Sequence, residues 1–331
     1  METHARYRVL RRLIVGAGVL FTAAVVLALG LQSVLEARDA RRFPPPGELV
    51  SVGEHRLHLY RTGTPAGRPT VILDAGGGSF SAQWGWVQPM VAEFTQVVSY
   101  DRPGLGWSEA GHPEADGFEV AEQLHAALQS LGVPGPYVLV GHSFGSVMIR
   151  AFTQRFPDEV AGLVHIDPRH LWMEDVLGDD VTREGDRMAR LLPLAARLGL
   201  ARLANPAAGM VAGLPMQQQA EGLAFFAHSR HLGAMAAEWP FSNRTVARLA
   251  ALGEDLGERP NIVLSATADD HYFYGERRAR FTASQAAIAT LSMRGEQRPV
   301  QGADHYTIVT DQRFARQVAA AIGEVTGDAV R

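Results

Sequence analysis

The chain has 331 residues, a formal net charge of −4 and no cysteine. This length can bury one large core, and the slightly acidic balance offers no basic surface for a phosphate backbone, so we expect no nucleic-acid partner. Thiol nucleophiles, disulfides and thiolate metal sites are excluded, and because all 31 basic residues are arginine, lysine chemistry is excluded as well.

The N-terminal segment is predicted to be an uncleaved membrane anchor. Residues 13–35 contain no charged side chain and follow a basic tail, residues 1–12. At about 1.5 Å per residue they reach roughly 34 Å, enough for the hydrocarbon core of a bilayer. A cleaved signal peptide has a shorter apolar region and is the first alternative, and a buried helix is the second.

The arginines of the tail predict a cytoplasmic N-terminus, with the remaining chain on the extracytoplasmic side. The arginine-only, alanine-rich composition suggests a bacterial source, and hence a bacterial cell membrane. Residues 36–47 are expected to be a linker that ends in Pro44-Pro45-Pro46-Gly47. Such a run favours a stiff, extended spacer that holds the folded part away from the bilayer.

A series of β-strands is predicted next. Strands at 48–52 and 55–60 form a hairpin, and a buried strand at 70–73 ends in the loop Asp74-Ala75-Gly76-Gly77-Gly78. A strand at 96–100 precedes the loop 101–108, in which Asp101 and Arg102 are expected to brace the turn as an ion pair. Residues 117–131 have a helical period.

The stretch 138–146 is the centre of the chain. A β-branched run stops at Gly141-His142-Ser143-Phe144-Gly145, and a helical pattern resumes at once. This order predicts a strand, a sharp turn and a helix, with glycines where strand and helix nearly touch and Ser143 at the tip. Ser143 is therefore the candidate nucleophile. The first backbone N–H groups of the helix, including that of Phe144, would point at a developing oxyanion.

This Gly-x-Ser-x-Gly turn and the sequence Asp-Arg-x-Gly-x-Gly-x-Ser at 101–108 resemble the α/β-hydrolase superfamily. The resemblance implies an α/β fold with a mostly parallel eight-stranded sheet flanked by helices, built from residues 48–167 and 261–331. It implies a helical cap inserted at residues 168–260, which includes helical segments at 191–203 and 217–238. In the cap, Met210, Met216, Phe225, Phe226 and Trp239 are candidate pocket lining, with packing of cap against core as the alternative.

The resemblance also implies the remaining site residues. The loop after the strand at 70–73 supplies a second oxyanion donor, the backbone N–H of Gly77, although Ala75-Gly76 stands where the family usually has His-Gly. Gly302-Ala303-Asp304-His305 resembles the family's Gly-x-x-His loop, which makes His305 the base. Three carboxylates remain open as the acid: Asp269 at the usual offset after the strand at 261–265, Asp167 at the end of the strand at 161–166, and Asp270. Asp269 is preferred.

The order nucleophile, acid, base predicts a Ser-His-Asp hydrolase that cleaves carboxylic esters of small molecules through an acyl-enzyme, as carboxylesterases do. Serine in place of the aspartate that dehalogenases and epoxide hydrolases of the superfamily use disfavours those activities. Thioesters, lactones and amides remain as substrates. The alternatives are a lyase or C–C bond hydrolase with the same triad, or a non-catalytic ligand-binding or signalling protein. No cofactor and no metal are expected.

Overall fold

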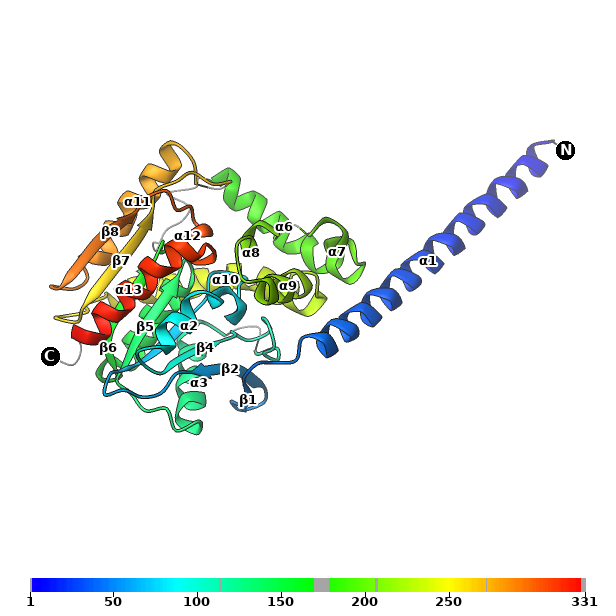
Figure 1. The fold of residues 1–331 in the computed structure, drawn as a ribbon. Helices are drawn as coiled ribbons and strands as arrows, with labels where there is room; N and C mark the ends of the chain where they lie inside the picture. The colour runs from blue at the N-terminus through cyan, green and yellow to red at the C-terminus, as the bar shows by residue number, and fades with distance from the viewer. Residues whose placement is uncertain (1, 113–114, 170–178, 206–207, 272, 329–331) are drawn as a thin grey trace.

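The computed structural model describes residues 2–112, 115–169, 179–205, 208–271 and 273–328. Within these residues, one eight-stranded sheet has the order β1-β2-β4-β3-β5-β6-β7-β8. The pairs β1–β2 and β2–β4 are antiparallel, and all other pairs are parallel. Helices flank the sheet (Figure 1). The mostly parallel eight-stranded α/β architecture is therefore confirmed.

The elements of this core have the following bounds. The strands are β1 (Glu48–Ser51), β2 (Arg56–Thr62), β3 (Thr70–Asp74), β4 (Val97–Tyr100), β5 (Tyr137–His142), β6 (Val160–Ile166), β7 (Asn261–Ala266) and β8 (Gly295–Val300). The helices are α2 (Val87–Ala92), α3 (Gly117–Ser130), α4 (Gly145–Arg155), α11 (Glu276–Ala289), α12 (Thr307–Thr310) and α13 (Gln312–Asp328), with short 3-10 turns at Ser81–Trp84 and Pro157–Glu159.

The central strands are buried on both faces, as parallel sheets require. Every residue of β3, β4 and β5 is buried. Side chains alternate along a strand, so β3 contributes to the hydrophobic clusters on both faces of the sheet. Ile72 packs with α3 and α4 on one face, and Val71 and Leu73 pack with α2 and α13 on the other. The parallel strands share one carboxyl edge, and the loops at that edge carry the candidate site residues.

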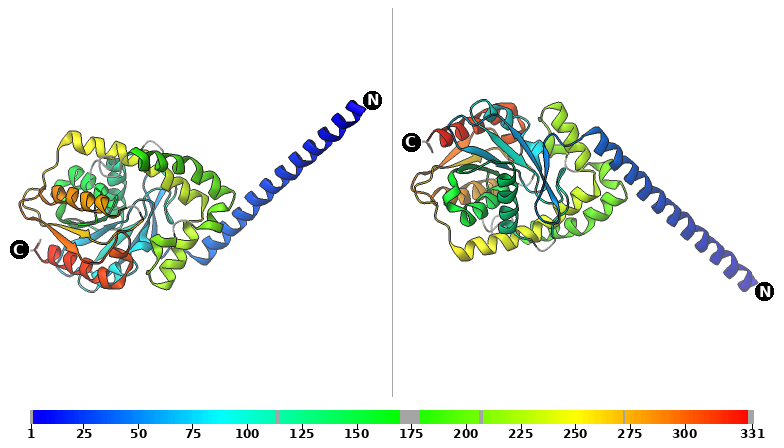
Figure 2. Two further views of the ribbon diagram at one scale, coloured as in Figure 1. Left: turned by 90° about the horizontal axis from the view of Figure 1, so that it is seen from above. Right: turned by 90° about the horizontal axis from the view of Figure 1, so that it is seen from below.

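Between β6 and β7 the described residues form helices and no strand. They are α6 (Asp179–Arg197), α7 (Leu200–Ala204), α8 (Ala208–Val211), α9 (Met216–Phe225) and α10 (Ser229–Leu252). Each expected helical segment of this region is divided in two, the first at Gly199, whose φ is +74°, and the second between α9 and α10. Figures 1 and 2 show α6, α7 and α9 between the sheet and α1, where a cap was expected.

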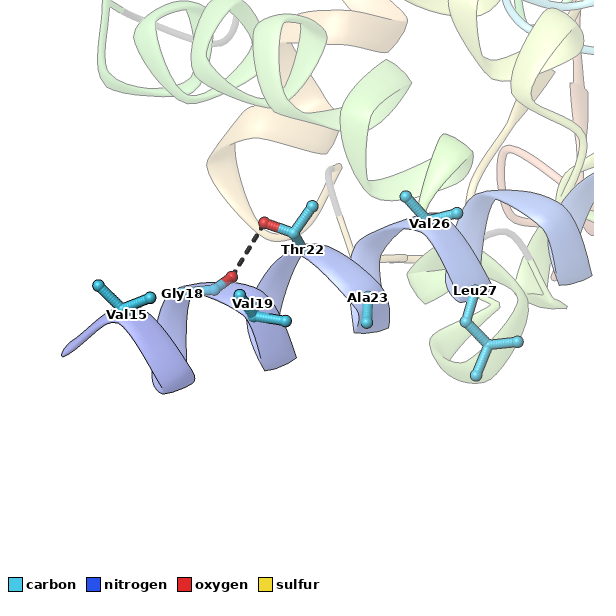
Figure 3. Close-up of a pocket in the computed structure, with 7 residues that line it drawn as sticks. All are labelled: Val15, Gly18, Val19, Thr22, Ala23, Val26 and Leu27. Carbon is cyan, nitrogen blue, oxygen red and sulfur yellow. Dashed lines mark hydrogen bonds between the residues drawn. The ribbon is translucent and has the colours of Figure 1, made fainter. Parts of the chain in front are cut away.

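A single long helix, α1 (Glu2–Arg42), projects from the domain (Figure 1). Its apolar section is exposed all round, since Leu20, Phe21 and Leu27 are 74%, 72% and 71% exposed. Figure 3 shows this section, in which Thr22 Oγ donates to Gly18 O at 2.9 Å, so its hydroxyl is paired within the helix. Among the described residues, this is the one helix long and apolar enough to cross a membrane.

The end of α1 differs from the expected linker. Residues 36–42 continue the helix, and its last turns contact the helices α6–α10 between β6 and β7, which we call the cap. Gln32 is only 3% exposed and donates to Ala227 O at 2.7 Å, while Ser229 N donates to Glu36 Oε1 at 2.7 Å. These contacts stabilise the helical conformation of residues 36–42, whose charged sequence alone did not predict a continuation of the helix. The end of α1 thus already contacts the folded part before the proline run at 44–46 begins.

Candidate active site

β5 and α4 meet at Ser143 in a turn that has no room for side chains. A Cβ on Gly141 would lie 2.5 Å from the backbone of Gly145, and a Cβ on Gly145 would lie 2.2 Å from the carbonyl oxygen that ends β3. Ser143 itself has a φ of +50°, a left-handed conformation that is strained for a residue with a Cβ. Its N–H donates to Ile166 O at 2.9 Å, which fixes the turn against the end of β6.

The imidazole of His305 lies between a hydroxyl and a carboxylate. Its Nε2 is 2.9 Å from Ser143 Oγ, and its Nδ1 is 2.6 Å from Asp167 Oδ2. These residues follow β5, β6 and β8, so the shared carboxyl edge brings them together. Asp167 is fully buried and His305 is 6% exposed. Both distances suit proton transfer from the serine to an imidazole whose other nitrogen donates to the carboxylate.

The other two candidate acids lie elsewhere. Asp269, preferred from the sequence, is exposed and accepts a hydrogen bond from Gly275 N at 3.1 Å, and among the described residues it does not contact the His305 ring. Asp270 Oδ2 accepts a hydrogen bond from the backbone N–H of His305 at 3.3 Å. The carboxylate beside the imidazole is that of Asp167, the alternative.

Two side chains of α11 hold Asp167, and no sequence motif indicated either. Arg278 Nη1 lies 3.0 Å from Asp167 Oδ2, and Gln285 Nε2 donates to Oδ1 at 2.9 Å. Burial alone would raise the pKa of Asp167, but the hydrogen bond and charge of His305, the charge of Arg278 and the bond from Gln285 outweigh it and lower the pKa to about 2. The carboxylate is therefore ionised at neutral pH.

The residue before the nucleophile is a neutral histidine. Burial, with the nearby His305 as a second cause, lowers the pKa of His142 to about 3. Its Nε2 lies 2.8 Å from His305 O and its Nδ1 lies 2.9 Å from Gln83 Nε2, so the first donates and the second accepts. Gln83 Oε1 in turn accepts from Gly76 N at 3.2 Å. This chain of hydrogen bonds joins the loop that carries His305, the histidine loop, to the loop 75–78 after β3, the glycine loop.

The glycine loop after β3 is braced by two charged side chains. Arg102 donates to Ala75 O at 2.6 Å and to Gly76 O at 2.7 Å. Glu238, which comes from α10 of the cap, accepts from Gly78 N at 2.5 Å and from Arg102 Nε at 2.6 Å. Arg102 and Glu238 thus orient the loop in which the superfamily usually has a histidine.

The expected pairing of Asp101 with Arg102 is replaced by other contacts. Arg102 pairs with Asp74 at 2.5 Å. Asp101 pairs with His58 at 3.0 Å and accepts from Ser81 N at 2.8 Å. Both side chains brace loops, as the sequence indicated. Asp101 also accepts from Trp107 N of its own loop at 2.8 Å, whereas Arg102 donates to the loop after β3.

Two backbone N–H groups at the site have no acceptor among the described residues, those of Gly77 and Phe144. The amides on either side of Gly77 are both bonded. The two residues are neighbours, because a Cβ on Gly77 would be 3.6 Å from Phe144 Cβ. An oxygen beside Ser143 could accept from both, which is the arrangement that stabilises an oxyanion.

A cavity of about 250 Å³ opens in front of Ser143, lined by the glycine loop, the histidine loop and the cap. Met210 and Trp239 line it, as suggested from the sequence. Phe225 and Phe226 are instead buried in clusters between cap and core, and Met216 is 88% exposed. Within the described part of the chain, no three His, Asp or Glu side chains are grouped so that they could hold a metal ion.

The chain is similar to known proteins in both sequence and structure. Residues 69–205 match the family described as alpha/beta hydrolase fold. The chain is similar to a laboratory-evolved variant of potato epoxide hydrolase, with a TM-score of 0.65, 15% identity and coverage of 85% of this chain and 98% of that chain. It is also similar to the enol-lactonase of Burkholderia xenovorans, with a TM-score of 0.61, 18% identity and coverage of 83% and 100%. At these identities the likeness shows the α/β-hydrolase fold.

Among curated sequences, an AB hydrolase superfamily protein of Gibberella zeae is 29% identical over 134 residues, which are 36% of this chain and 41% of that protein. The chain spans 17% to 41% of the length of the first curated relatives that it matches. These matches therefore concern part of each relative.

Proposed function

We propose that this chain, which has the α/β-hydrolase fold, is a serine hydrolase that cleaves carboxylic esters through an acyl-enzyme. The observation that carries the proposal is the 2.9 Å contact between Ser143 Oγ and His305 Nε2. An alcohol nucleophile at the turn favours attack on an acyl carbon. The aspartate that epoxide hydrolases of this superfamily use at the same point is not present.

The proton moves between Ser143 and His305 in both halves of the reaction. As Oγ attacks the ester carbonyl, Nε2 accepts its proton and then delivers it to the leaving alcohol, which leaves an acyl-enzyme. Water then attacks the acyl carbon, its proton passes to Nε2, and His305 returns a proton to Ser143. The acid product and the free enzyme result.

Asp167 is the acid in this proposal. Its carboxylate, 2.6 Å from His305 Nδ1, fixes the tautomer that leaves Nε2 free to accept a proton and stabilises the imidazolium that forms. Its low pKa supports this role, because a neutral carboxyl group could not offset the charge on the ring. Asp269, exposed and 3.1 Å from Gly275 N, has no such contact in the described chain.

The N–H groups of Gly77 and Phe144 are proposed as the oxyanion hole. Each needs an acceptor, and the carbonyl oxygen of an ester becomes a stronger acceptor as it gains negative charge in the transition state. The contacts of Arg102 and Glu238 support this role, since they hold the loop of Gly77 in one orientation before substrate binds.

The shape and lining of the cavity support a small acyl substrate. Phe144, Met210, Met235 and Trp239 give it apolar walls, and about 250 Å³ suits a short to medium acyl chain. We further propose that α1 anchors the protein in a bacterial cell membrane with the catalytic domain on the extracytoplasmic side. Its length and its exposed apolar surface support the anchor, and the N-terminal arginines support the orientation.

Turnover of p-nitrophenyl butyrate by the full chain in detergent tests the proposal, together with labelling by a fluorophosphonate probe. We expect wild-type protein to hydrolyse the ester and to be labelled, and Ser143→Ala to lose both. Activity that persists in Ser143→Ala would overturn the proposal. Absence of both from a folded wild-type protein would instead support the non-catalytic alternative.

A further inference from the structure

The cap carries four exposed leucines. Leu191, Leu194, Leu200 and Leu203 are 50%, 57%, 51% and 86% exposed, and they lie on the second half of α6 and on α7. We call these residues the cap leucine patch. Large apolar side chains grouped in this way on a surface mark a contact with another apolar phase or molecule.

The cap leucine patch lies next to the base of α1. Gly199, between α6 and α7, faces the side chain of Gln32, since a Cβ on it would lie 3.5 Å from Gln32 Oε1. Arg202 of α7 pairs with Asp39 of α1 at 2.8 Å. Figures 1 and 2 show from three sides that these cap helices are the part of the domain from which α1 projects.

The position of these contacts along α1 sets the distance between cap and bilayer. The uncharged stretch begins at Leu13, and the first hydrogen bond from α1 to the cap is that of Gln32, so we take residues 13–31 as the part available to the hydrocarbon core. Nineteen residues at about 1.5 Å each reach roughly 28 Å, close to the thickness of that core. A bilayer spanned by these residues therefore ends where the cap begins.

Positive charge accompanies the leucines. Arg183, Arg187 and Arg190 are exposed on α6, and together with Leu191 they line one shallow depression. A helix that exposes arginines along with leucines is typical of helices that lie in the interface of a membrane with anionic lipids. The arginines would meet the headgroups while the leucines enter the boundary with the acyl chains.

We propose that the cap leucine patch and the arginines of α6 bind the surface of the bilayer that α1 spans, with anionic phospholipid headgroups as the partners of the arginines. This inference rests on the anchor proposed above and adds a second membrane contact to it. The cap, which supplies Met210 and Met235 to the cavity wall, would then lie between the sheet and the lipid. An ester dissolved in the bilayer would reach the site across the shortest aqueous distance.

The natural absence of cysteine allows a direct test in the full chain. Leu203→Cys and Leu194→Cys are each labelled with an environment-sensitive fluorophore and reconstituted into vesicles of phosphatidylcholine with phosphatidylglycerol. Lipids that carry a quencher at a shallow acyl position are added. We expect both labels to lose roughly half of their emission, because they lie at the boundary of headgroups and acyl chains.

Two further labels are the controls. Leu20→Cys, in the middle of the apolar stretch, should be quenched by a deep quencher, whereas Met293→Cys, which is 76% exposed on the turn before β8, should not be quenched. If Leu20→Cys is quenched and Leu203→Cys behaves like Met293→Cys, the inference is wrong and the anchor stands. If Leu20→Cys is not quenched, the anchor itself is wrong, and the inference fails with it.

A charge variant separates the arginines from the leucines. Combined Arg187→Glu and Arg190→Glu should reduce the quenching of Leu203→Cys in vesicles that contain phosphatidylglycerol and have little effect in pure phosphatidylcholine. If the label on Leu203→Cys is quenched equally with and without the two substitutions in both kinds of vesicle, the arginines do not bind anionic headgroups, and that part of the inference is wrong. An unchanged far-ultraviolet circular dichroism spectrum shows in each case that the domain is folded.

Discussion

His305 Nδ1 and Asp167 Oδ2 are 2.6 Å apart, and Asp167 has a left-handed backbone, with a φ of +38°. This conformation is strained for a residue with a Cβ, and it directs the carboxylate toward the sheet edge where His305 lies. Hydrogen bonds from Arg278 and Gln285 offset the strain. Ser143, at φ +50°, is strained in the same way, so two of the three proposed catalytic residues hold their positions against local backbone preference.

The first prediction concerns the choice of acid. Asp167→Asn keeps the shape of the side chain but removes the charge that stabilises the imidazolium, so kcat should fall by on the order of 10³ to 10⁴. Asp269→Asn is the matched control and should keep near-normal turnover, because Asp269 is exposed and bonded to Gly275. Steady-state hydrolysis of p-nitrophenyl butyrate measures both. The reverse order of effects would return the acid to Asp269.

The second prediction concerns Arg278. It is buried and pairs with both Asp167 and Asp270, at 3.0 Å and 2.7 Å. Arg278→Gln leaves these carboxylates without their shared cation, so the free energy of unfolding should fall by about 3 to 5 kcal/mol. Arg280→Gln, two residues along α11 and exposed, should change it by less than about 1 kcal/mol. Urea denaturation in detergent measures the free energy of unfolding of both variants. Equally small decreases in the two variants would show that the buried ion pairs of Arg278 do not stabilise the fold more than the exposed pair of Arg280.

The third prediction concerns Glu238. Glu238→Gln can keep only one of the two hydrogen bonds that Gly78 N and Arg102 donate, since its amide nitrogen is not an acceptor. The loop that carries the Gly77 N–H should lose its fixed orientation. We expect kcat to fall by about 10-fold to 100-fold with a smaller change in KM, because the oxyanion contact is made in the transition state. A rise in KM at constant kcat would indicate instead that Glu238 contacts the substrate.

The fourth prediction is a pH dependence of stability. Burial, with the neighbouring Arg230 as the second cause, lowers the pKa of His231 to about 3, whereas an unfolded histidine titrates near 6.5. Between these values the unfolded state binds a proton that the folded state does not. The free energy of unfolding therefore does not change through titration of this histidine above about pH 6.5, and it decreases as the pH falls from 6.5 toward 3.

The variant His231→Gln isolates this effect, because glutamine can still accept from Gly106 N and donate to Gly78 O. Unfolding by urea is followed at pH 7.5, 6.5 and 5.5. The difference in unfolding free energy between wild type and variant should narrow by about 1 kcal/mol per pH unit below pH 6.5. A difference that stays constant would show that His231 is not buried in its neutral form.

Local motifs explain why part of the site could be predicted from the sequence. The turn at Ser143 and the loop at His305 are each encoded within a few neighbouring residues, and the glycine loop follows a clear buried strand. The eight-stranded sheet could be predicted from the same strand patterns. The acid could not be chosen, because Asp167 and Asp269 both follow parallel strands at one edge, and only tertiary packing decides which carboxylate meets the imidazole.

The supporting residues had no such signal. Gln83, Glu238 and Arg278 act through contacts with loops far away in the chain, and none belongs to a motif. The helical conformation of residues 36–42 also could not be predicted, because it depends on contacts of Glu36 and Asp39 with the cap.

The attachment of α1 to the cap determines which part of the protein can move. Gln32, Glu36 and Asp39 all bind cap residues, so the cap and the end of α1 form one unit. If α1 is fixed in a bilayer, the cap is fixed with it, and any displacement between cap and sheet is a displacement of the sheet relative to the membrane.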